Sequence, residues 1–283
     1  MRPAMEELAR RYEKKTGQEV QIDYGGSGEL LVKIRAVRAG DLYVCHDPFN
    51  GALMQTDLGA DAWTVAALTP VIAVAKGNPK TIEGLRDLAR HDVRVVLTHP
   101  VYSTAGHIWK HALAEAGLID AVKKQTVTIT KQGGEAANAV AIGTADAAIV
   151  WNAVAFVRRE KLDMVPIERR WMPRPDVDAV TTATYGKIQM DQVRVTIATL
   201  KCSEQPEKAR RFAEFVASPE GMRVFAERGF TPPDPARSSE DAVTPDVRGR
   251  LLVHCGAGMR DPIAKLADLF ESDVTSMPEV RER

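Results

Sequence analysis

The fold is decided by the stretch VQIDYGGSGELLVKIRAVRAGDLYVC, residues 20–45, which runs from one strand pattern through a helix pattern into a second strand pattern. VQIDY alternates as strands do, and the glycines of GGSG then permit a tight turn. After the turn, apolar residues recur at the spacing of one helical face, and DLYVC is another short apolar run. Residues 20–45 therefore predict a strand–helix–strand unit.

The same alternation continues on both sides of this unit. A helix pattern fills residues 2–15, and one long helix is expected over residues 206–228. Further strands are expected at residues 69–75, 93–97, 126–130, 147–151 and 192–200, and near residue 164. Short apolar strands that alternate with helices predict an α/β fold with largely parallel sheets, and the length suffices for two lobes. In such sheets ligands bind beyond the carboxyl ends of the strands.

The composition limits the classes of partner. Lys and Arg together number 38 and equal Asp and Glu at 38, so no basic excess indicates nucleic-acid or anionic-membrane binding. The longest apolar run, near residues 63–75, is too short to span a bilayer. Three dispersed cysteines without CxxC spacing exclude a zinc ribbon and a dense disulfide framework. The sequence opens without a secretory-signal pattern, so we expect either a cytosolic chain or a start that lies further upstream.

The end of the chain repeats its beginning. Residues 234–249 are rich in Pro, Ser, Asp and Glu and are interpreted as a linker. The unit at residues 250–283 contains LLVHCGAGMRDPIAKLADLFESD, in which residues 259–273 align without gaps to residues 1–15. The identical positions of the repeat are Met259, Arg260, Leu266, Ala267 and Glu271. Because the repeated helix follows a strand, the N-terminal helix is expected to lack its first strand, and LLVHCGAG is expected to supply it.

Three arrangements of this unit remain open. A linker of this length extends up to about 50 Å, enough to return LLVHCGAG to the first lobe of the same chain. The same reach allows a strand-swapped homodimer through residues 250–283. The third arrangement is that residues 250–283 are a truncated second copy. A lobe without this strand would expose long sheet edges, which promote aggregation.

Four strand-to-helix turns carry residues suited to holding an oxyanion. Glycine lets the backbone approach closely, hydroxyls donate hydrogen bonds, and a helix N-terminus presents unpaired N–H groups at the positive end of its dipole. These turns lie at residues 26–28, 103–106, 133–135 and 256–258. Each turn alone is equally typical of an ordinary capped helix, whereas four in one alternating chain favour an anion site.

Trp151 and Asn152 end the strand AAIVW and form a fifth candidate group, because that strand end should open on the same cleft. For Trp151, packing in the core is an equally open interpretation.

Together these segments resemble the molybdate- and tungstate-binding proteins of ABC importers, which have the type II periplasmic binding-protein fold. The resemblance covers residues 1–233 in order. It is carried by the helix start at residues 103–106 and by GSGELLVKI, GDLYVCHDP, PVIAVAKGNPKTIEGLRDLAR, GTADAAIVW and PEKARRFAEFVASPEGMRVFAERGF. It implies two lobes, each a mixed or parallel sheet flanked by helices, with a ligand cleft between them. Lobe I would comprise residues 1–73 and 190–233, and lobe II residues 74–189.

The resemblance also implies ligand positions. In that family the anion is held by a small residue after the first strand, a serine after the second, N–H groups at a helix start in the second lobe, and an aromatic hydroxyl. The sequence departs from this pattern by having Trp151 where a tyrosine is common and Gly-Ala-Gly rather than a serine in the first-strand turn. With the turn residues included, the predicted ligand-binding set is Ser27, Gly28, Ser103, Thr104, Ala105, Glu135, Trp151, Asn152, Gly256 and Ala257.

Glu135 is the one acidic member of this set. It would be a ligand if the coordination were expanded beyond tetrahedral or if the ligand were a metal cation. The alternative is an ordinary glutamate at a helix start, where its charge favours the dipole.

Histidine and cysteine patterns leave further alternatives open. His107 and His111 share a helix face at the spacing of a two-histidine metal site, but solvated helix histidines give the same pattern and no HExxH motif is present. The dipeptides Cys45-His46 and His254-Cys255 lie in strands expected to be neighbours. They are consistent with a disulfide, a soft-metal site, or buried structural cysteines.

We therefore expect a non-enzymatic solute-binding protein that closes on an oxyanion like molybdate or tungstate and then engages an ABC permease. The resemblance implies a periplasmic or extracellular location. No catalytic residue, resident metal or cofactor is predicted beyond the bound anion. Alternatives are a binding protein for another anion or a metal, an enzyme on the same fold, or a regulatory sensor module. The sequence lacks the GxSxG, P-loop and HExxH motifs, and it has no helix-turn-helix segment.

Overall fold

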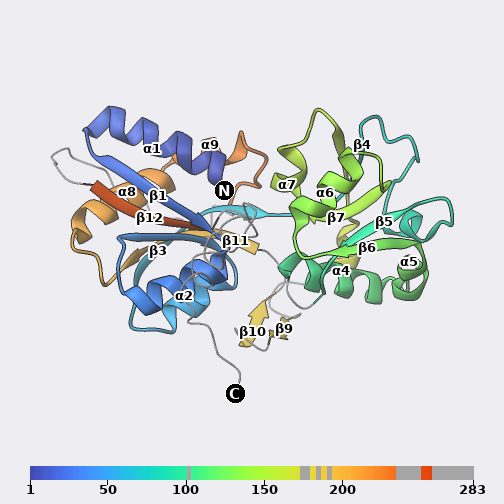
Figure 1. Ribbon diagram of the computed structural model, residues 1–283, viewed down its shortest axis with the longest axis horizontal. Coiled ribbons are helices and arrows are strands. Elements are labelled where there is room, and N and C mark those ends of the chain that lie inside the picture. Colours follow the sequence, from blue (N-terminus) through green and yellow to red (C-terminus); the bar gives the residue numbers. More distant parts are fainter. Residues whose placement is uncertain (101–102, 173–178, 183–185, 190–192, 234–249, 257–283) are drawn as a thin grey trace, which may run out of the picture.

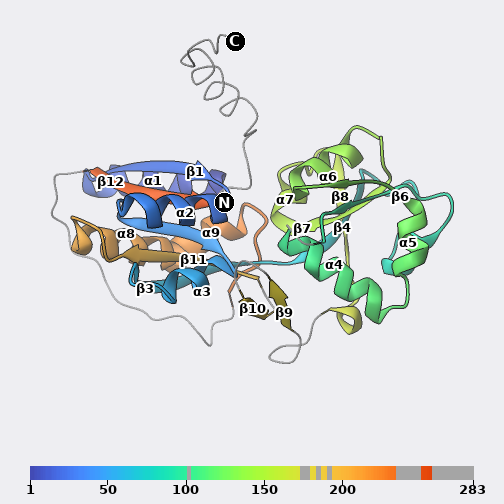
Figure 2. The ribbon, with the colours of Figure 1, turned by 60° about the horizontal axis from the view of Figure 1, so that its bottom comes forward.

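The protein forms two lobes that lie side by side (Figures 1 and 2). The computed structural model describes residues 1–100, 103–172, 179–182, 186–189, 193–233 and 250–256. Each lobe contains a five-stranded mixed sheet with helices against it. The predicted two-lobed α/β fold class is therefore confirmed.

The first sheet has the strand order β1-β12-β2-β11-β3. Its strands are β1 (Glu19–Gly25), β2 (Leu42–His46), β3 (Gly59–Leu68), β11 (Val193–Leu200) and β12 (Arg250–Gly256). The strands β1, β12 and β2 run parallel to one another, whereas β11 is antiparallel to both β2 and β3. The long strand β3 was not predicted, because its first half alternates only weakly and contains exposed residues.

Helices cover both faces of the first sheet. Its helices are α1 (Arg2–Thr16), α2 (Ser27–Val37), α3 (Phe49–Met54), α8 (Pro206–Ala217) and α9 (Pro219–Ala226). Helices α1, α8 and α9 pack in one apolar cluster with the inward side chains of β12 and β2, and helices α2 and α3 pack against the opposite face. The single long helix expected over residues 206–228 is two helices, because Pro219 disfavours helical geometry at Ser218.

The second sheet has the order β6-β5-β7-β4-β8. Its strands are β4 (Pro70–Ala75), β5 (Val95–Thr98), β6 (Thr126–Thr130), β7 (Ala147–Trp151) and β8 (Leu162–Pro166). The helices of this lobe are η1 (Leu85–Ala89), α4 (Thr104–Glu115), α5 (Ile119–Gln125), α6 (Gly133–Ala141), α7 (Asn152–Phe156) and η2 (Arg169–Trp171). One face packs against α4, α5 and η1, and the other against α6 and α7. A separate antiparallel pair consists of β9 (Ala179–Thr182) and β10 (Gly186–Gln189).

Strand β12 lies in the middle of the parallel part of the first sheet. It pairs with β1 from Glu19↔Arg250 to Gly25↔Gly256 and with β2 on its other side. Asp41 fixes the register, because its carboxylate accepts a hydrogen bond of 2.7 Å from the Leu252 N–H and its own N–H donates to the Leu252 carbonyl. The segment that the sequence predicts as a returning strand thus takes its place between β1 and β2. Ala257, Gly258 and the repeated helix lie outside the described residues.

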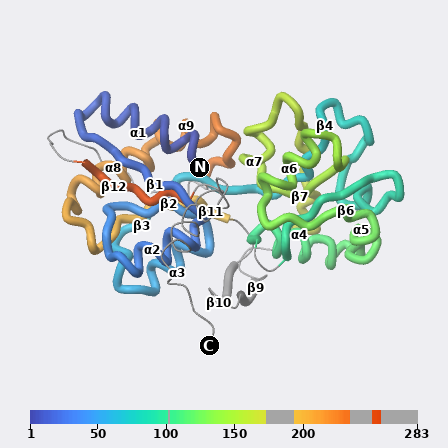
Figure 3. The backbone as a smooth tube through the Cα atoms, viewed as in Figure 1, coloured from blue at the N-terminus to red at the C-terminus, as the bar shows by residue number. Residues whose placement is uncertain are grey.

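The chain crosses between the lobes at Thr69, where the tube in Figure 3 runs from the left lobe to the right one. Strand β3 ends at Leu68 in the first sheet, and β4 begins at Pro70 in the second. The first crossing therefore lies earlier than the residue 73 boundary drawn from the sequence, since residues 70–73 pair with β7 and β8. No helix in the described part of the chain has the length and apolar character needed to cross a membrane.

Two leucines of β12 test its placement. Leu251 is fully buried in the cluster that includes α1, whereas its neighbour Leu252 is only half-buried. We expect Leu251→Ala to lower the free energy of unfolding by about 2–4 kcal/mol, because it leaves a cavity. Leu252→Ala is the matched control. It should lower the free energy of unfolding by about 1 kcal/mol or less, because it removes less buried apolar area.

Urea denaturation followed by circular dichroism measures both variants. Equal, small effects would contradict the placement of β12, since a strand outside the sheet would expose both side chains alike.

Candidate functional site

The carboxyl ends of the parallel strands of both sheets face the lobe boundary. In the first sheet β3 ends at the crossing, and β2, β12 and β1 run in the same direction as β3. In the second sheet β4 starts at the crossing, so its antiparallel neighbour β7 ends there, and β5 and β6 run parallel to β7. The turns predicted to hold an anion follow these strand ends, so the topology directs them toward the boundary between the lobes.

Three helices begin at these strand ends. The first intrahelical bonds run from Leu30 to the Gly26 carbonyl in α2, from His107 to Ser103 in α4, and from Ala136 to Gln132 in α6. The backbone N–H groups of each first turn therefore have no acceptor within their own helix. These groups, with the positive ends of the helix dipoles, are suited to an anion.

Ser27 is the most closely fitted of the predicted ligand residues. It is the first residue of α2 and is only 7% exposed. The fully buried Tyr43 donates a hydrogen bond of 2.6 Å to the Ser27 carbonyl, which positions the start of the helix. Gly256 lies directly against Ser27, because a Cβ on Gly256 would collide with the Ser27 hydroxyl oxygen. The structure thus brings Ser27, Gly28 and Gly256 together, while Ala257 lies outside the described residues.

In the second lobe, the candidate residues are distributed over two helix starts. Ser103 precedes α4, Thr104 opens it, and Ala105 is buried in its first turn. Gly106 is required there, since a Cβ would collide with the His99 carbonyl of the preceding turn. Glu135 lies in the first turn of α6 with its side chain exposed.

Trp151 and Asn152 have structural partners at the lobe boundary. Trp151 is 8% exposed and belongs to the apolar cluster that also contains Leu68, Ala105 and Phe230. Its core-packing interpretation therefore has direct structural support.

Asn152 of the second lobe contacts the crossing residue Thr69 and Thr231 of the first lobe. Its Oδ1 accepts a hydrogen bond of 3.0 Å from the Thr69 N–H, and its Nδ2 donates at 3.0 Å to the Thr231 hydroxyl. The Thr69 and Thr231 hydroxyl oxygens are 2.6 Å apart, and the Asn152 N–H donates to the Thr69 carbonyl. We call Thr69, Asn152 and Thr231 the hinge network. Thr231 also forms a backbone bridge with Ala67 of β3.

The cysteines of the neighbouring strands lie on opposite faces of the sheet. Cys255 pairs in register with Val44, so the adjacent Cys45 points the other way. The two residues accordingly belong to different apolar clusters, and all three cysteines are free thiols. Of the alternatives left open by the sequence, the structure excludes a Cys45–Cys255 disulfide and agrees with buried structural cysteines. Burial raises the pKa of Cys255 to about 12, as expected for an inert buried thiol. Among the residues that the structure describes, no group of three or more His, Cys, Asp or Glu side chains could hold a metal ion.

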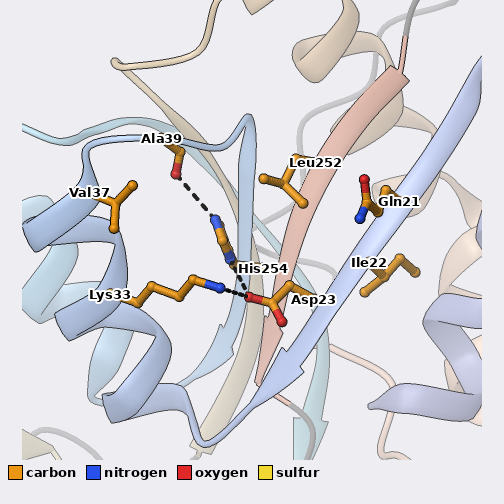
Figure 4. Close-up of a pocket in the computed structure, with 8 residues that line it drawn as sticks. All are labelled: Gln21, Ile22, Asp23, Lys33, Val37, Ala39, Leu252 and His254. Atoms are coloured by element: carbon orange, nitrogen blue, oxygen red, sulfur yellow. Dashed lines mark hydrogen bonds and ion pairs between the residues drawn. The ribbon is translucent and has the colours of Figure 1, made fainter. Parts of the chain in front are cut away.

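A cavity of about 300 Å³ lies beside α2, on the sheet face formed by β1 and β12 (Figure 4). His254, which is 2% exposed, spans it: Nδ1 lies 3.3 Å from an Asp23 carboxylate oxygen and Nε2 lies 3.2 Å from the Ala39 carbonyl. Each of the two ring nitrogens thus faces one oxygen acceptor. Lys33 donates to the same Asp23 oxygen at 2.7 Å. This cluster connects β12 to β1 and to Ala39, which lies two residues beyond the end of α2.

Sequence reasoning missed Tyr43, Thr98, Thr69 and Thr231. Tyr43 reads as one more apolar residue in a buried strand, and the hinge threonines meet only through folding. Thr98 ends β5 fully buried, and its hydroxyl has no partner among the described residues. The position of Thr98 at a strand end was the one available sequence signal.

Comparison with known proteins identifies the class. The profile of the bacterial extracellular solute-binding protein family matches residues 1–231, and the chain belongs to this family. Members bind solutes and are not enzymes, and the family is that of ABC-transporter binding proteins located outside the cytoplasmic membrane.

Two curated relatives are similar over most of the chain. The putative ABC transporter substrate-binding lipoprotein YvgL of Bacillus subtilis is 26% identical over 232 residues, covering 81% of this chain and 82% of that protein. The molybdate-binding protein ModA of Mycobacterium tuberculosis is 25% identical over 219 residues, covering 77% of this chain and 75% of that protein.

Solved structures share the fold at lower identity. The substrate-binding domain of a putative molybdenum ABC transporter from Clostridium difficile has a TM-score of 0.66 at 20% identity, covering 82% of this chain and 95% of that chain. The sulfate-binding protein SubI from Mycobacterium tuberculosis has a TM-score of 0.62 at 18% identity over 98% and 96% of the two chains. Iron-bound HitA from Pseudomonas aeruginosa has a TM-score of 0.61 at 20% identity over 86% of each.

The hinge network provides one prediction. Asn152→Ala and Thr231→Val should each lower the free energy of unfolding by about 1–2 kcal/mol, because each leaves polar partners unpaired. Their effects should not add, since both remove the same hydrogen bond. Urea denaturation of the two variants and the double variant measures this; additive effects would contradict a shared network.

The pH dependence of Asp23 gives another prediction. Burial alone would raise the pKa of Asp23, but the hydrogen bond and charge of Lys33 and the charge of His254 outweigh it and hold the pKa below its ordinary 3.8. Because the folded state favours the carboxylate, this stabilisation is fully present above the ordinary pKa and is lost as the pH falls through the folded pKa. Asp23→Asn should therefore destabilise the protein at neutral pH, and its difference from the wild type should shrink below about pH 4.

Urea midpoints measured from neutral to acidic pH test this expectation. Asp57→Asn is the control, because Asp57 pairs with Arg38 in an ion pair that is well exposed and contributes little. A pH-independent difference for Asp23→Asn would contradict the ion-pair explanation.

Proposed function

We propose that this solute-binding protein closes its lobes on a small, fully ionised oxyanion of the molybdate and tungstate type and delivers it to an ABC permease. The lobes move about the hinge network, and ligand binding favours the closed arrangement. The anion lies at the lobe boundary, beyond the carboxyl ends of the strands.

The observation that carries this proposal is the donor set at that boundary. Ser27 offers a nearly buried hydroxyl, and the first turns of α2, α4 and α6 offer backbone N–H groups without intrahelical acceptors. A tetrahedral oxyanion without protons requires donors and no acceptors, and such a site needs no Lys or Arg. Selection among oxyanions of the same charge then depends on the radius of the closed site.

The names of similar proteins support this class of ligand. ModA is described as molybdate-binding, the Clostridium difficile domain belongs to a putative molybdenum transporter, and SubI is described as sulfate-binding. HitA is described as iron-bound, so a metal is the competing ligand class, in which the exposed Glu135 would acquire a role.

The lobe assignment follows the sheets. Lobe I comprises the first sheet and lobe II the second. Within lobe I, β12 occupies the place of the strand that the N-terminal helix α1 was expected to lack. In this arrangement Gly256, at the end of β12, lies directly against Ser27 of the anion site, so β12 contributes to ligand binding as well as to stability.

Titration calorimetry with molybdate, tungstate, sulfate, phosphate and ferric citrate tests the proposal. We expect binding of molybdate and tungstate, with weaker binding or none for sulfate because its radius is smaller. Heat with ferric citrate alone would replace the oxyanion with a metal, and no heat with any of these ligands would contradict the proposal.

Ser27→Ala is the matched structural test. We expect it to weaken anion binding about 10- to 100-fold, because it removes one hydrogen bond to a charged ligand. Ser218→Ala is the control: Ser218 caps α9, where its hydroxyl accepts from the Gly221 N–H. The control should lower stability and leave the affinity unchanged, whereas equal affinities for all three proteins would exclude Ser27 as a ligand.

A further inference from the structure

Helix α1 fills a groove on the first lobe whose walls come from distant parts of the chain. Its buried side chains are Ala4, Met5, Leu8, Ala9 and Tyr12. They belong to one apolar cluster with residues of β12, α8 and α9. The Tyr12 ring packs edge-on against Phe212 with centroids 5.0 Å apart, and it also contacts Phe215 at 5.2 Å.

The repeat at residues 259–273 carries a matching apolar set at the positions that α1 buries. In the gapless alignment Met5 corresponds to Ile263, Leu8 to Leu266, Ala9 to Ala267 and Tyr12 to Phe270, and the remaining buried residue, Ala4, corresponds to Pro262. The outward positions do not match, since the exposed Arg10 and Arg11 correspond to Asp268 and Leu269. The similarity is therefore concentrated on the face that the groove of the first lobe contacts.

The connectivity directs both segments to the same groove. Strand β12 leads directly into the repeat, and α1 leads directly into β1, the parallel neighbour of β12. A helix that follows a strand and precedes its parallel neighbour packs on the face set by a right-handed crossover. Helix α1 already lies on the β12 face in this way, as its contacts with β12 and β1 show.

We propose that residues 259–273 form a second helix for the α1 groove, so that two segments of one chain compete for one binding surface. Helix α1 holds the groove in the wild-type protein because it has contacts that the repeat cannot make. Arg11 pairs with Glu220 of α9 at 3.3 Å and with Glu7 of α1 at 2.8 Å, whereas the repeat has Leu269 and Lys265 at these two positions. When α1 is weakened, residues 259–273 take its place while β12 remains in the sheet.

A double-mutant cycle tests this exchange in the full-length chain. Leu8→Asp places a charge at the centre of the α1 contact, and Leu266→Asp does the same to the competing segment. Leu266→Asp alone should leave the urea midpoint unchanged, because α1 fills the groove. Leu8→Asp alone should lower the midpoint only partly, since residues 259–273 replace α1. In the double variant the unfolding equilibrium constant should rise at least about tenfold above that of Leu8→Asp alone, as for a buried charge.

Leu269→Asp is the matched control, because its aligned residue Arg11 faces solvent. Leu8→Asp/Leu269→Asp should be as stable as Leu8→Asp. A Leu8→Asp/Leu266→Asp variant with the stability of Leu8→Asp would overturn the proposal, and so would a Leu8→Asp protein that does not fold. The milder variants Leu8→Ala and Leu8→Ala/Leu266→Ala provide the same comparison. The double variant should again be less stable than the single one, and equal stabilities would again overturn the proposal. A midpoint of Leu8→Asp that rises with protein concentration would support exchange with a second copy of the chain, and a constant midpoint would support exchange within one chain.

Discussion

The pairing of β12 with β1 on one side and β2 on the other connects nearly every feature of the first lobe. Backbone N–H and C=O groups of all three strands depend on it, since the edges of β1 and β2 that face β12 would otherwise lack partners. The side chains of β12 also complete both faces of the sheet: Leu251, Val253 and Cys255 support α1, and His254 supports the end of α2. The position of Ser27 depends on the same strand through Gly256. Fold, stability and candidate site therefore share one structural origin.

The second constraint is the boundary between the lobes, where both apolar packing and polar contacts connect them. Each lobe has its own apolar clusters and its own helix N-termini, but the cluster that contains Trp151 and Phe230 includes residues of both lobes. Polar contacts join the crossing residue Thr69 and the second-lobe residue Asn152 to Thr231 of the first lobe. Structures of this fold include a sulfate-binding protein and an iron-bound protein, so the fold by itself does not determine the ligand.

Much of the fold can be predicted from local sequence patterns. VQIDY and AAIVW are strands as predicted, and GSG opens a helix, because short-range periodicity and turn chemistry reflect the face that each segment buries. The faces themselves depend on register: only the pairing of Cys255 with Val44 shows that Cys45 lies on the opposite side of the sheet. The hinge contacts of Asn152 and the hydrogen bond from Tyr43 to Ser27 join residues far apart in sequence, so no local pattern specifies them. The break at Pro219, in contrast, was open to prediction from the proline itself.

The distance along the chain between β1 and β12 has a kinetic consequence. Arg250 pairs with Glu19, so the parallel core of the first lobe closes between residues separated by most of the sequence. Contacts of such separation form slowly, because the entropy of closing a long loop is lost before they contribute. During synthesis the second lobe is complete before β12 leaves the ribosome, so it can fold while β1 and β2 still lack the strand between them. Such a chain exposes two open sheet edges for that interval, and its yield of native protein depends on how well those edges are shielded until β12 arrives.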